Sequence, residues 1–145
     1  MSKSIYIING PNLNLLGTRE PEIYGTATLG DIEDACAKQA KDAGYKTVFK
    51  QSNVEGELVN MIQEARDKAC ALILNPAAYT HTSVAIYDAL KTLDIPVIEV
   101  HLSQPAKRES FRRRSFVAEA ATGTISGFGK ESYALGITAA IQLMK

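Results

Sequence analysis

The chain has 145 residues, 46% of them hydrophobic, which suits one domain over residues 1–145 with one hydrophobic core. Sixteen basic residues balance sixteen acidic ones, so no field of one sign would recruit nucleic acid or an anionic membrane. The longest apolar runs are too short to cross a bilayer, and the run Ile5 to Ile8 predicts a strand rather than a signal peptide. We therefore expect a cytoplasmic protein.

The predicted elements alternate along the chain between strands and helices. Short β-branched runs mark the strands, and apolar residues three and four apart mark the helices. Gly44 is predicted to end the first helix. In chain order, we expect a strand at 4–8, a helix at 28–44, a strand at 46–51, a helix at 55–69, a strand at 70–75, a helix at 82–94, strands at 95–101 and 122–128, and a helix at 131–145.

Continuously apolar strands indicate a parallel sheet that is covered by helices on both faces. Right-handed crossovers then place helices on both sides of the sheet. Five strands in 145 residues suit a doubly wound, flavodoxin-like α/β fold, and by analogy with that class we expect the strand order 2-1-3-4-5. Ligands of such sheets bind beyond the carboxyl ends of the strands, so the residues that follow each strand are candidates for function.

Unusual polar residues follow three of the predicted strands. The first strand runs into residues 9–12, Asn-Gly-Pro-Asn, and the third runs into Asn75 and Pro76. The fourth strand ends in Glu99 and His101, with Ser103 just beyond, so that all these residues belong to one edge of the sheet. We expect a single site at this edge.

The stretch "NGPNLNLLGTREPEIYG", residues 9–25, has three Asn, three Gly and two Pro, which predicts a loop that neither packs nor forms regular structure. Within it, Arg19 lies five residues before Tyr24. A free phenol has a pKa of about 10 and is a poor base at neutral pH, but a nearby cation favours the phenolate. The pair is therefore either an activated base or a surface tyrosine beside a solvated arginine.

The strand end "IEVHLS" puts Glu99 and His101 on one face, because side chains alternate along a strand. A carboxylate bonded to one imidazole nitrogen fixes the tautomer and leaves the other nitrogen to move a proton. Two other interpretations remain open here. The pair could be purely structural, or Glu99 and His101 could bind a metal together with His81, although no HxxxH or HxH spacing supports this.

The segment "NPAAYTHTSVAIYDAL", residues 75–90, carries Asn75 at a strand end and His81 at a helix start. His81 is either a binding residue or a simple loop histidine. Helical spacing places Asp88 on one face with Val84, Tyr87 and Leu90, and we expect this face to be covered. The carboxylate of Asp88 then either meets solvent or reaches across a subunit contact.

The segment "AKRESFRRRS", residues 106–115, contains five basic side chains. Arg108 and Arg112 are four apart, which predicts one side of a helical turn. They could bind the oxygens of an anionic, hydroxylated substrate. A nucleic-acid patch is disfavoured because no aromatic residues alternate with the charges and the chain is neutral.

With these residues in hand, the chain closely resembles the type II 3-dehydroquinate dehydratases from about Ile5 to Ala140. Three blocks, residues 9–25, 75–90 and 96–103, occur in the order and at the spacing of that family. The resemblance implies the cofactor-independent dehydration of 3-dehydroquinate to 3-dehydroshikimate, a reaction of aromatic amino acid biosynthesis and of quinate breakdown. It also implies no metal and no Schiff-base lysine. A flavodoxin-like FMN module, the main rival, would need a Ser/Thr-Gly-rich phosphate loop where this chain has "NGPNLNLLG".

The resemblance further implies the catalytic roles. Tyr24, as a phenolate, would abstract the C2 proton, and Arg19 on the same mobile loop would lower the tyrosine's pKa. Asn12 would hold the enolate through an ordered water. His101, oriented by Glu99, would protonate the departing C1 hydroxyl.

Substrate binding is implied in the same way. The carboxylate would be held by Asn75, by Ser103 and by the backbone N–H groups of Leu102 and Ser103. His81 and Arg112 would bind the ring hydroxyls. Asp88 would complete the site of a neighbouring subunit, in a dodecamer built of four trimers.

Two departures from the family pattern stand out. Residues 104–107, Gln-Pro-Ala-Lys, replace an expected Asn, an aliphatic residue and His-Ala, which affects the contacts expected of Arg108. Tyr87 replaces a common arginine beside Asp88. Neither departure touches the expected base or acid.

Overall fold

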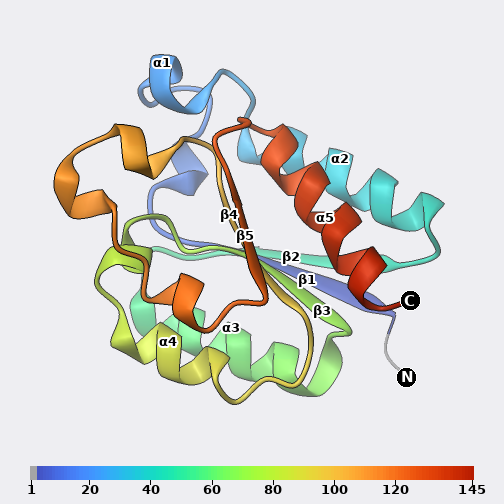
Figure 1. The fold of residues 1–145 in the computed structure, drawn as a ribbon. Helices are drawn as coiled ribbons and strands as arrows, with labels where there is room; N and C mark the ends of the chain where they lie inside the picture. The colour runs from blue at the N-terminus through green and yellow to red at the C-terminus, as the bar shows by residue number, and fades with distance from the viewer. Residues whose placement is uncertain (1–2) are drawn as a thin grey trace.

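The structure is a computed structural model that describes residues 3–145. Its centre is one five-stranded parallel sheet with the order β2-β1-β3-β4-β5 (Figure 1). The predicted doubly wound α/β fold and its strand order are confirmed. The strands are β1 (Ser4–Asn9), β2 (Lys46–Gln51), β3 (Ala71–Asn75), β4 (Val97–His101) and β5 (Gly123–Ser126).

Helices cover both faces of the sheet (Figure 1). Two of them, α2 (Leu29–Asp42) and α5 (Glu131–Leu143), pack together on one face. On the other face lie α3 (Glu55–Lys68) and α4 (Val84–Leu90). Five 3-10 turns and a four-residue helix fill the connections: η1 (Leu13–Leu15), α1 (Pro21–Tyr24), η2 (Ala77–His81), η3 (Pro105–Lys107), η4 (Ser110–Arg112) and η5 (Val117–Glu119).

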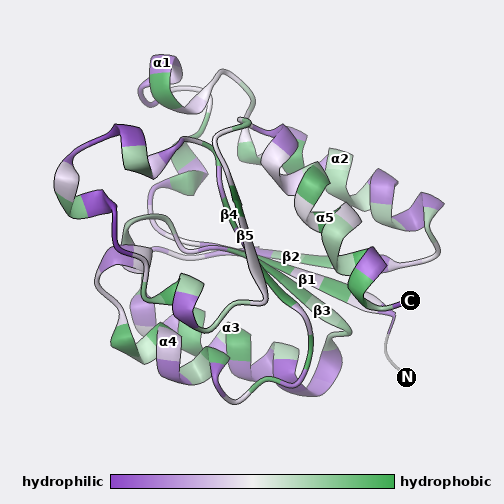
Figure 2. Ribbon diagram, in the orientation of Figure 1, coloured by the Kyte–Doolittle hydropathy of each residue, from purple (hydrophilic) through white to green (hydrophobic). Residues whose placement is uncertain are grey.

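The sheet separates two apolar clusters, which explains why its three central strands, β1, β3 and β4, are buried on both faces, whereas the edge strands β2 and β5 are only partly buried. In β1, Ile5 and Ile7 point toward α2 and α5, whereas Tyr6 and Ile8 point toward α3 and α4. Figure 2 shows the apolar residues concentrated along the strands and on the inward sides of the helices. Parallel strands buried on both faces have this pattern.

The end of α2 follows the prediction at Gly44. Gly44 has a φ of +90° and its N–H donates to Lys41, while Tyr45 N–H donates to Ala40. This is the Schellman arrangement, in which a left-handed glycine satisfies the last carbonyl groups of a helix.

The face predicted for α4 is wrong in part: Leu90 is buried as expected, but Val84 and Asp88 are not covered within the single chain. Its buried residues are Ile86, Ala89 and Leu90, whereas Val84 is 52% exposed and Asp88 is also exposed. The helix starts only at Val84, after the cap in which Ser83 Oγ accepts from Ile86 N–H. The four-residue spacing from Val84 to Asp88 therefore marks the outward face of the helix in this chain.

The prediction that residues 9–25 neither pack nor form regular structure is also wrong in part. Leu13 and Leu16 are each 5% exposed and belong to the core cluster under α2 and α5. The same segment forms η1 and α1. Asparagine, glycine and proline make up eight of the seventeen residues, but the interspersed leucines are enough to attach the start of the loop to the core.

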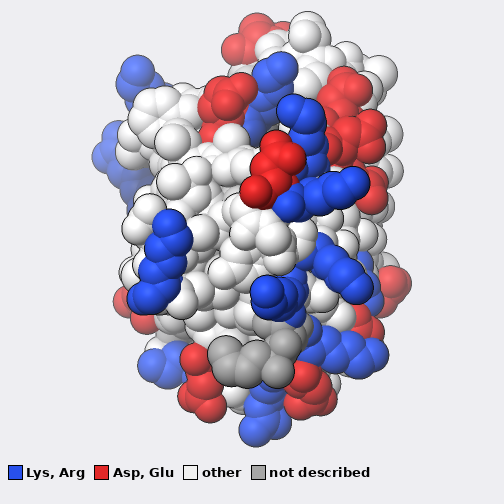
Figure 3. Space-filling model, turned by 90° about the vertical axis from the view of Figure 1, so that its right-hand side faces the viewer, with Lys and Arg blue, Asp and Glu red and all other residues white. Residues whose placement is uncertain are grey.

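The last two features concern the hydrophobicity of the helices and the charge of the surface. Among residues 3–145, no helix has the length and apolar character needed to cross a membrane. Basic and acidic side chains are mixed over the face shown in Figure 3, in keeping with the balanced charge of the chain.

Candidate active site

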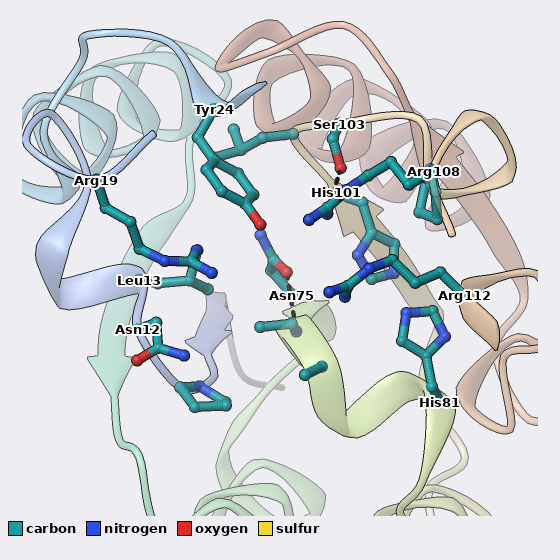
Figure 4. Close-up of a pocket in the computed structure, with 15 residues that line it drawn as sticks. Asn12, Leu13, Arg19, Tyr24, Asn75, His81, His101, Ser103, Arg108 and Arg112 are labelled. Carbon is teal, nitrogen blue, oxygen red and sulfur yellow. Dashed lines mark hydrogen bonds between the residues drawn. The ribbon is translucent and has the colours of Figure 1, made fainter. Parts of the chain in front are cut away.

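A pocket of about 230 Å³ opens at the carboxyl ends of β1, β3 and β4, where the fold class predicts a ligand (Figure 4). Its walls come from the loop after β1, from η2 and from residues 101–112. Most of the expected site residues are brought together here: Asn12, Arg19, Tyr24, Asn75, His81, His101, Leu102, Ser103 and Arg112, together with Arg108.

Gly10 allows two of these walls to meet. Its N–H donates to Asn75 O at 2.8 Å, and a Cβ at this position would lie 2.5 Å from Pro76 O. No other residue would fit without moving the backbone. Asn12 follows in a left-handed conformation, φ 69°, and its N–H donates to Asn53 Oδ1 at 3.0 Å.

Tyr24 lies between two guanidinium groups at the mouth of the pocket. The Cζ of Arg19 is 4.6 Å from the centroid of the Tyr24 ring, and that of Arg108 is 5.3 Å away. Arg19 also forms an ion pair with Glu20, with 3.8 Å between Nη2 and Oε2. Of the two interpretations of the Arg19–Tyr24 pair, the structure favours a pocket residue flanked by cations over a tyrosine on open surface.

Glu99 and His101 form a buried pair, as the strand alternation predicts. His101 Nε2 lies 2.6 Å from Glu99 Oε2, and the two residues are 8% and 0% exposed, respectively. His101 lines the pocket, whereas Glu99 lies behind it. With Nε2 engaged by the carboxylate, Nδ1 is the imidazole nitrogen available for proton transfer.

Hydroxyl groups surround the carboxylate of Glu99. Thr80 Oγ1 and Ser115 Oγ donate to it, and Thr124 Oγ1 adds a weaker contact at 3.3 Å. Burial raises the pKa of Glu99, but the hydrogen bond and charge of His101 and the hydroxyl donors outweigh it and hold the pKa below its usual value. Glu99 is therefore an anion that can stabilise a protonated His101.

Sequence reasoning missed these three hydroxyl residues. Thr80 lies inside the block at 75–90, where a threonine next to His81 could have drawn attention. Ser115 and Thr124 are 16 and 25 residues from Glu99 and carry no local pattern. Only the folded structure identifies them as hydrogen-bond donors to the carboxylate of Glu99.

The basic residues after β4 reach the pocket in a different way from the one predicted. Arg108 has extended backbone angles between η3 and η4, so the helical turn expected to join it to Arg112 is absent. Both still line the pocket: Arg108 Nη1 donates to Ser103 Oγ at 3.3 Å, and Arg112 Nε donates to Glu109.

Two of the unusual positions have structural consequences. Pro105, in the unusual segment 104–107, lines the pocket, and Gln104 Oε1 accepts a hydrogen bond from Ser126 Oγ at 2.8 Å.

Asp88, which was expected at the site of a neighbouring subunit, is absent from the lining of the pocket formed by residues 3–145 of a single chain.

The metal interpretation gains no support from the arrangement. His81 Nδ1 lies 2.7 Å from Arg114 O, which directs this ring toward the backbone. Within the described part of the chain, no three His, Cys, Asp or Glu side chains are grouped as ligands of one ion.

Comparison with known proteins agrees with the fold. The family model for class II dehydroquinases matches residues 3–141. The 3-dehydroquinate dehydratase of Phenylobacterium zucineum (strain HLK1) is 61% identical over 145 residues, covering 100% of both chains. The crystal structure of the type II dehydroquinase from Propionibacterium acnes has a TM-score of 0.91 and 42% identity, covering 99% of this chain and 97% of that one. The type II dehydroquinase from Butyrivibrio crossotus DSM 2876 has a TM-score of 0.94 and 38% identity, covering 97% and 98%. The chain therefore belongs to the class II dehydroquinase family, as its three sequence blocks predicted.

Proposed function

We propose that this hydro-lyase, a 3-dehydroquinate dehydratase by family, removes water from 3-dehydroquinate by anti elimination through an enolate. The observation that carries the proposal is the arrangement of Tyr24 and His101 in one pocket. Tyr24 has guanidinium groups beside it, and His101 has a buried carboxylate behind it. One side chain is suited to accept a proton and the other to donate one.

In the first step, the Tyr24 phenolate takes the proton from C2, and the C–H electrons form the enolate of the C3 ketone. Arg19 stabilises the phenolate by its charge, since its guanidinium lies 4.6 Å from the ring centroid. Asn12, acting through a water, stabilises the negative oxygen of the enolate.

In the second step, the enolate reforms the ketone and expels the C1 hydroxyl. His101 Nδ1 gives its proton to that oxygen, which leaves as water. Glu99 accepts from Nε2 at 2.6 Å, and its negative charge stabilises the imidazolium before the transfer.

The remaining pocket residues bind the substrate. We propose that Asn75 and Ser103, with the N–H groups of Leu102 and Ser103, hold the carboxylate, while His81 and Arg112 hold the ring hydroxyls. Closure of the part of the loop that carries Arg19 and Tyr24 over the substrate would exclude water from the base. No cofactor takes part in this scheme.

We also propose the setting of the reaction. The enzyme acts in the cytoplasm, in the shikimate pathway or in quinate breakdown, because both use this dehydration. It works as a dodecamer of four trimers, in which Asp88 of one subunit completes the pocket of another.

The direct test is to mix the purified protein with 3-dehydroquinate and to follow the absorbance of the enone product. We expect the absorbance to rise, and we expect a chelator to leave the rate unchanged. A flat trace at high enzyme concentration would contradict the assignment.

Tyr24→Phe tests the base. It should lower kcat by about 10²- to 10⁴-fold, the usual contribution of a general base, while substrate still binds. Tyr45→Phe is the control, since Tyr45 lies beyond the end of α2 and is absent from the pocket lining. Retained turnover in Tyr24→Phe would remove Tyr24 from its role.

A further inference from the structure

A buried phenol lies beneath the floor of the pocket and connects two strand ends. Tyr133, on α5, is 1% exposed. Its hydroxyl donates to Asn9 Oδ1 at 2.6 Å and accepts from Asn75 Nδ2 at 2.9 Å. Asn9 and Asn75 end the adjacent strands β1 and β3 and are partners in register. Tyr133 therefore contacts a pocket residue, although it does not itself line the pocket.

Backbone groups at both ends determine the direction of the hydrogen bonds that run from Asn9 through Tyr133 to Asn75. Asn9 Nδ2 donates to Lys50 O at 3.0 Å, and Asn75 Oδ1 accepts from Ala77 N–H at 3.1 Å. A carbonyl can only accept and an N–H can only donate, so the amide oxygen of Asn9 and the amide nitrogen of Asn75 must face Tyr133. The phenol then donates to Asn9 and accepts from Asn75, and the opposite direction is excluded.

This direction determines what Asn75 offers to a ligand. One Nδ2 hydrogen is used by Tyr133 and the oxygen is used by Ala77, so the second Nδ2 hydrogen remains. Asn75 is 2% exposed and lines the pocket, where Figure 4 shows its amide below the hydroxyl of Tyr24. The amide thus presents a donor, which suits an anionic carboxylate.

We propose that Tyr133 is a positioning residue, which aims an N–H of Asn75 at the carboxylate of the substrate; this inference rests on the proposed function. Burial raises the pKa of Tyr133, and so keeps the hydroxyl hydrogen that the network needs. Without the hydroxyl, Asn75 Nδ2 loses its acceptor and Ala77 N–H alone holds the amide. The amide can then rotate away from the substrate.

Tyr133→Phe tests this inference by the split between KM and kcat. We expect KM for 3-dehydroquinate to rise about tenfold, the loss of one hydrogen bond to a charged group, with kcat little changed. Asn75→Ala should raise KM similarly, and the double variant should raise it no further, because Tyr133 acts through Asn75. Tyr6→Phe is the control. It removes another buried tyrosine hydroxyl, which donates to Glu64 and lies outside the pocket lining, so KM should not change.

A purely structural role for Tyr133 would give a different result. The melting temperature would fall while KM stayed constant, or the two KM increases would multiply in the double variant; either result overturns the inference. If Tyr133→Phe does not fold, Asn9→Ala replaces it, because the phenol then lacks the acceptor that directs its hydrogen.

A crystal structure of the ligand-free variant provides a readout that needs no activity. We expect the Asn75 amide in Tyr133→Phe to rotate away from its wild-type position, and an unmoved amide would overturn the inference. An inactive wild-type enzyme would instead refute the proposed function, and the crystallographic result would still decide the role of Tyr133.

Discussion

The environment of Glu99 shows how single side chains set the chemistry of this pocket. A buried carboxylate without partners would take up a proton, because burial disfavours the charged form. Here His101, Thr80 and Ser115 all bond to it, and these contacts outweigh burial so that the pKa of Glu99 is lowered. The residue can then hold one imidazole nitrogen and stabilise positive charge on the ring.

Glu99→Gln should show the contribution of the Glu99 charge to the free energy of unfolding. Because the folded-state pKa of Glu99 is lowered, its charge contributes stability above the unfolded-state pKa of about 4.3, and this is lost as pH falls through the lower folded-state value. The difference in free energy of unfolding between wild type and variant should therefore shrink below about pH 4.3. Urea unfolding at pH 7 and at several acidic pH values measures it. A difference independent of pH would contradict the prediction.

At the scale of elements, the pocket depends on how closely the ends of β1 and β3 approach each other. Gly10 is essential to this contact, since any Cβ would collide with the backbone of Pro76. Gly136 in α5 has a related role, because a Cβ there would lie 3.0 Å from Val100 Cγ1. A glycine inside a helix, unfavourable by propensity, here lets α5 pack closely on the sheet.

Gly10→Ala should therefore destabilise the protein by about 1–3 kcal/mol, the usual cost of overpacking, and should also raise KM by displacing Pro76 and its neighbour Asn75. Chemical denaturation and steady-state kinetics measure the two effects. Gly56→Ala is the matched control: Gly56 lies in α3, and apart from its chain neighbours and the backbone of its own helix no heavy atom lies within 4 Å of the added Cβ. It should stabilise the helix by about 0.5–1 kcal/mol. Unchanged stability in Gly10→Ala would show that the two loops can separate freely.

At the scale of the whole molecule, the outward face of α4 bears on the proposed assembly. Val84 and Asp88 are exposed in the single chain, one helical turn apart. If Asp88 completes the pocket of another subunit, each site combines Tyr24 of one subunit with Asp88 of a neighbour. An assembly made only of Tyr24→Phe subunits, or only of Asp88→Ala subunits, then has no complete site. Mixed subunits would form some sites with both native residues.

This gives a complementation test. Each variant alone should have little activity, whereas subunits unfolded, mixed in equal amounts and refolded together should recover about one quarter of the wild-type sites by random assortment. Sedimentation velocity of the wild type should show a particle twelve times the mass of one chain. If the co-refolded mixture shows no more activity than the two variants measured separately, that result would contradict a shared site.

Much of the protein could be predicted from its sequence, because local patterns carry the information. Short β-branched runs located the five strands, and the helical spacing located α2 and α3 within a few residues. Polar residues at the strand ends located the pocket, because parallel strands bring their carboxyl ends to one edge. The family followed from the three blocks.

Only the tertiary structure decided which groups surround those residues. Glu99 meets Ser115 and Thr124 across 16 and 25 residues, and Asn75 meets Tyr133 across 58. Serine, threonine and tyrosine have no spacing signal at such separations, since their contacts arise from the packing of one element on another. The leucines at 13 and 16 entered the core for the same reason. The periodicity of apolar residues indicates which face of a helix or strand is buried. The hydrogen-bond partner of a buried hydroxyl depends instead on how elements distant in the sequence pack together.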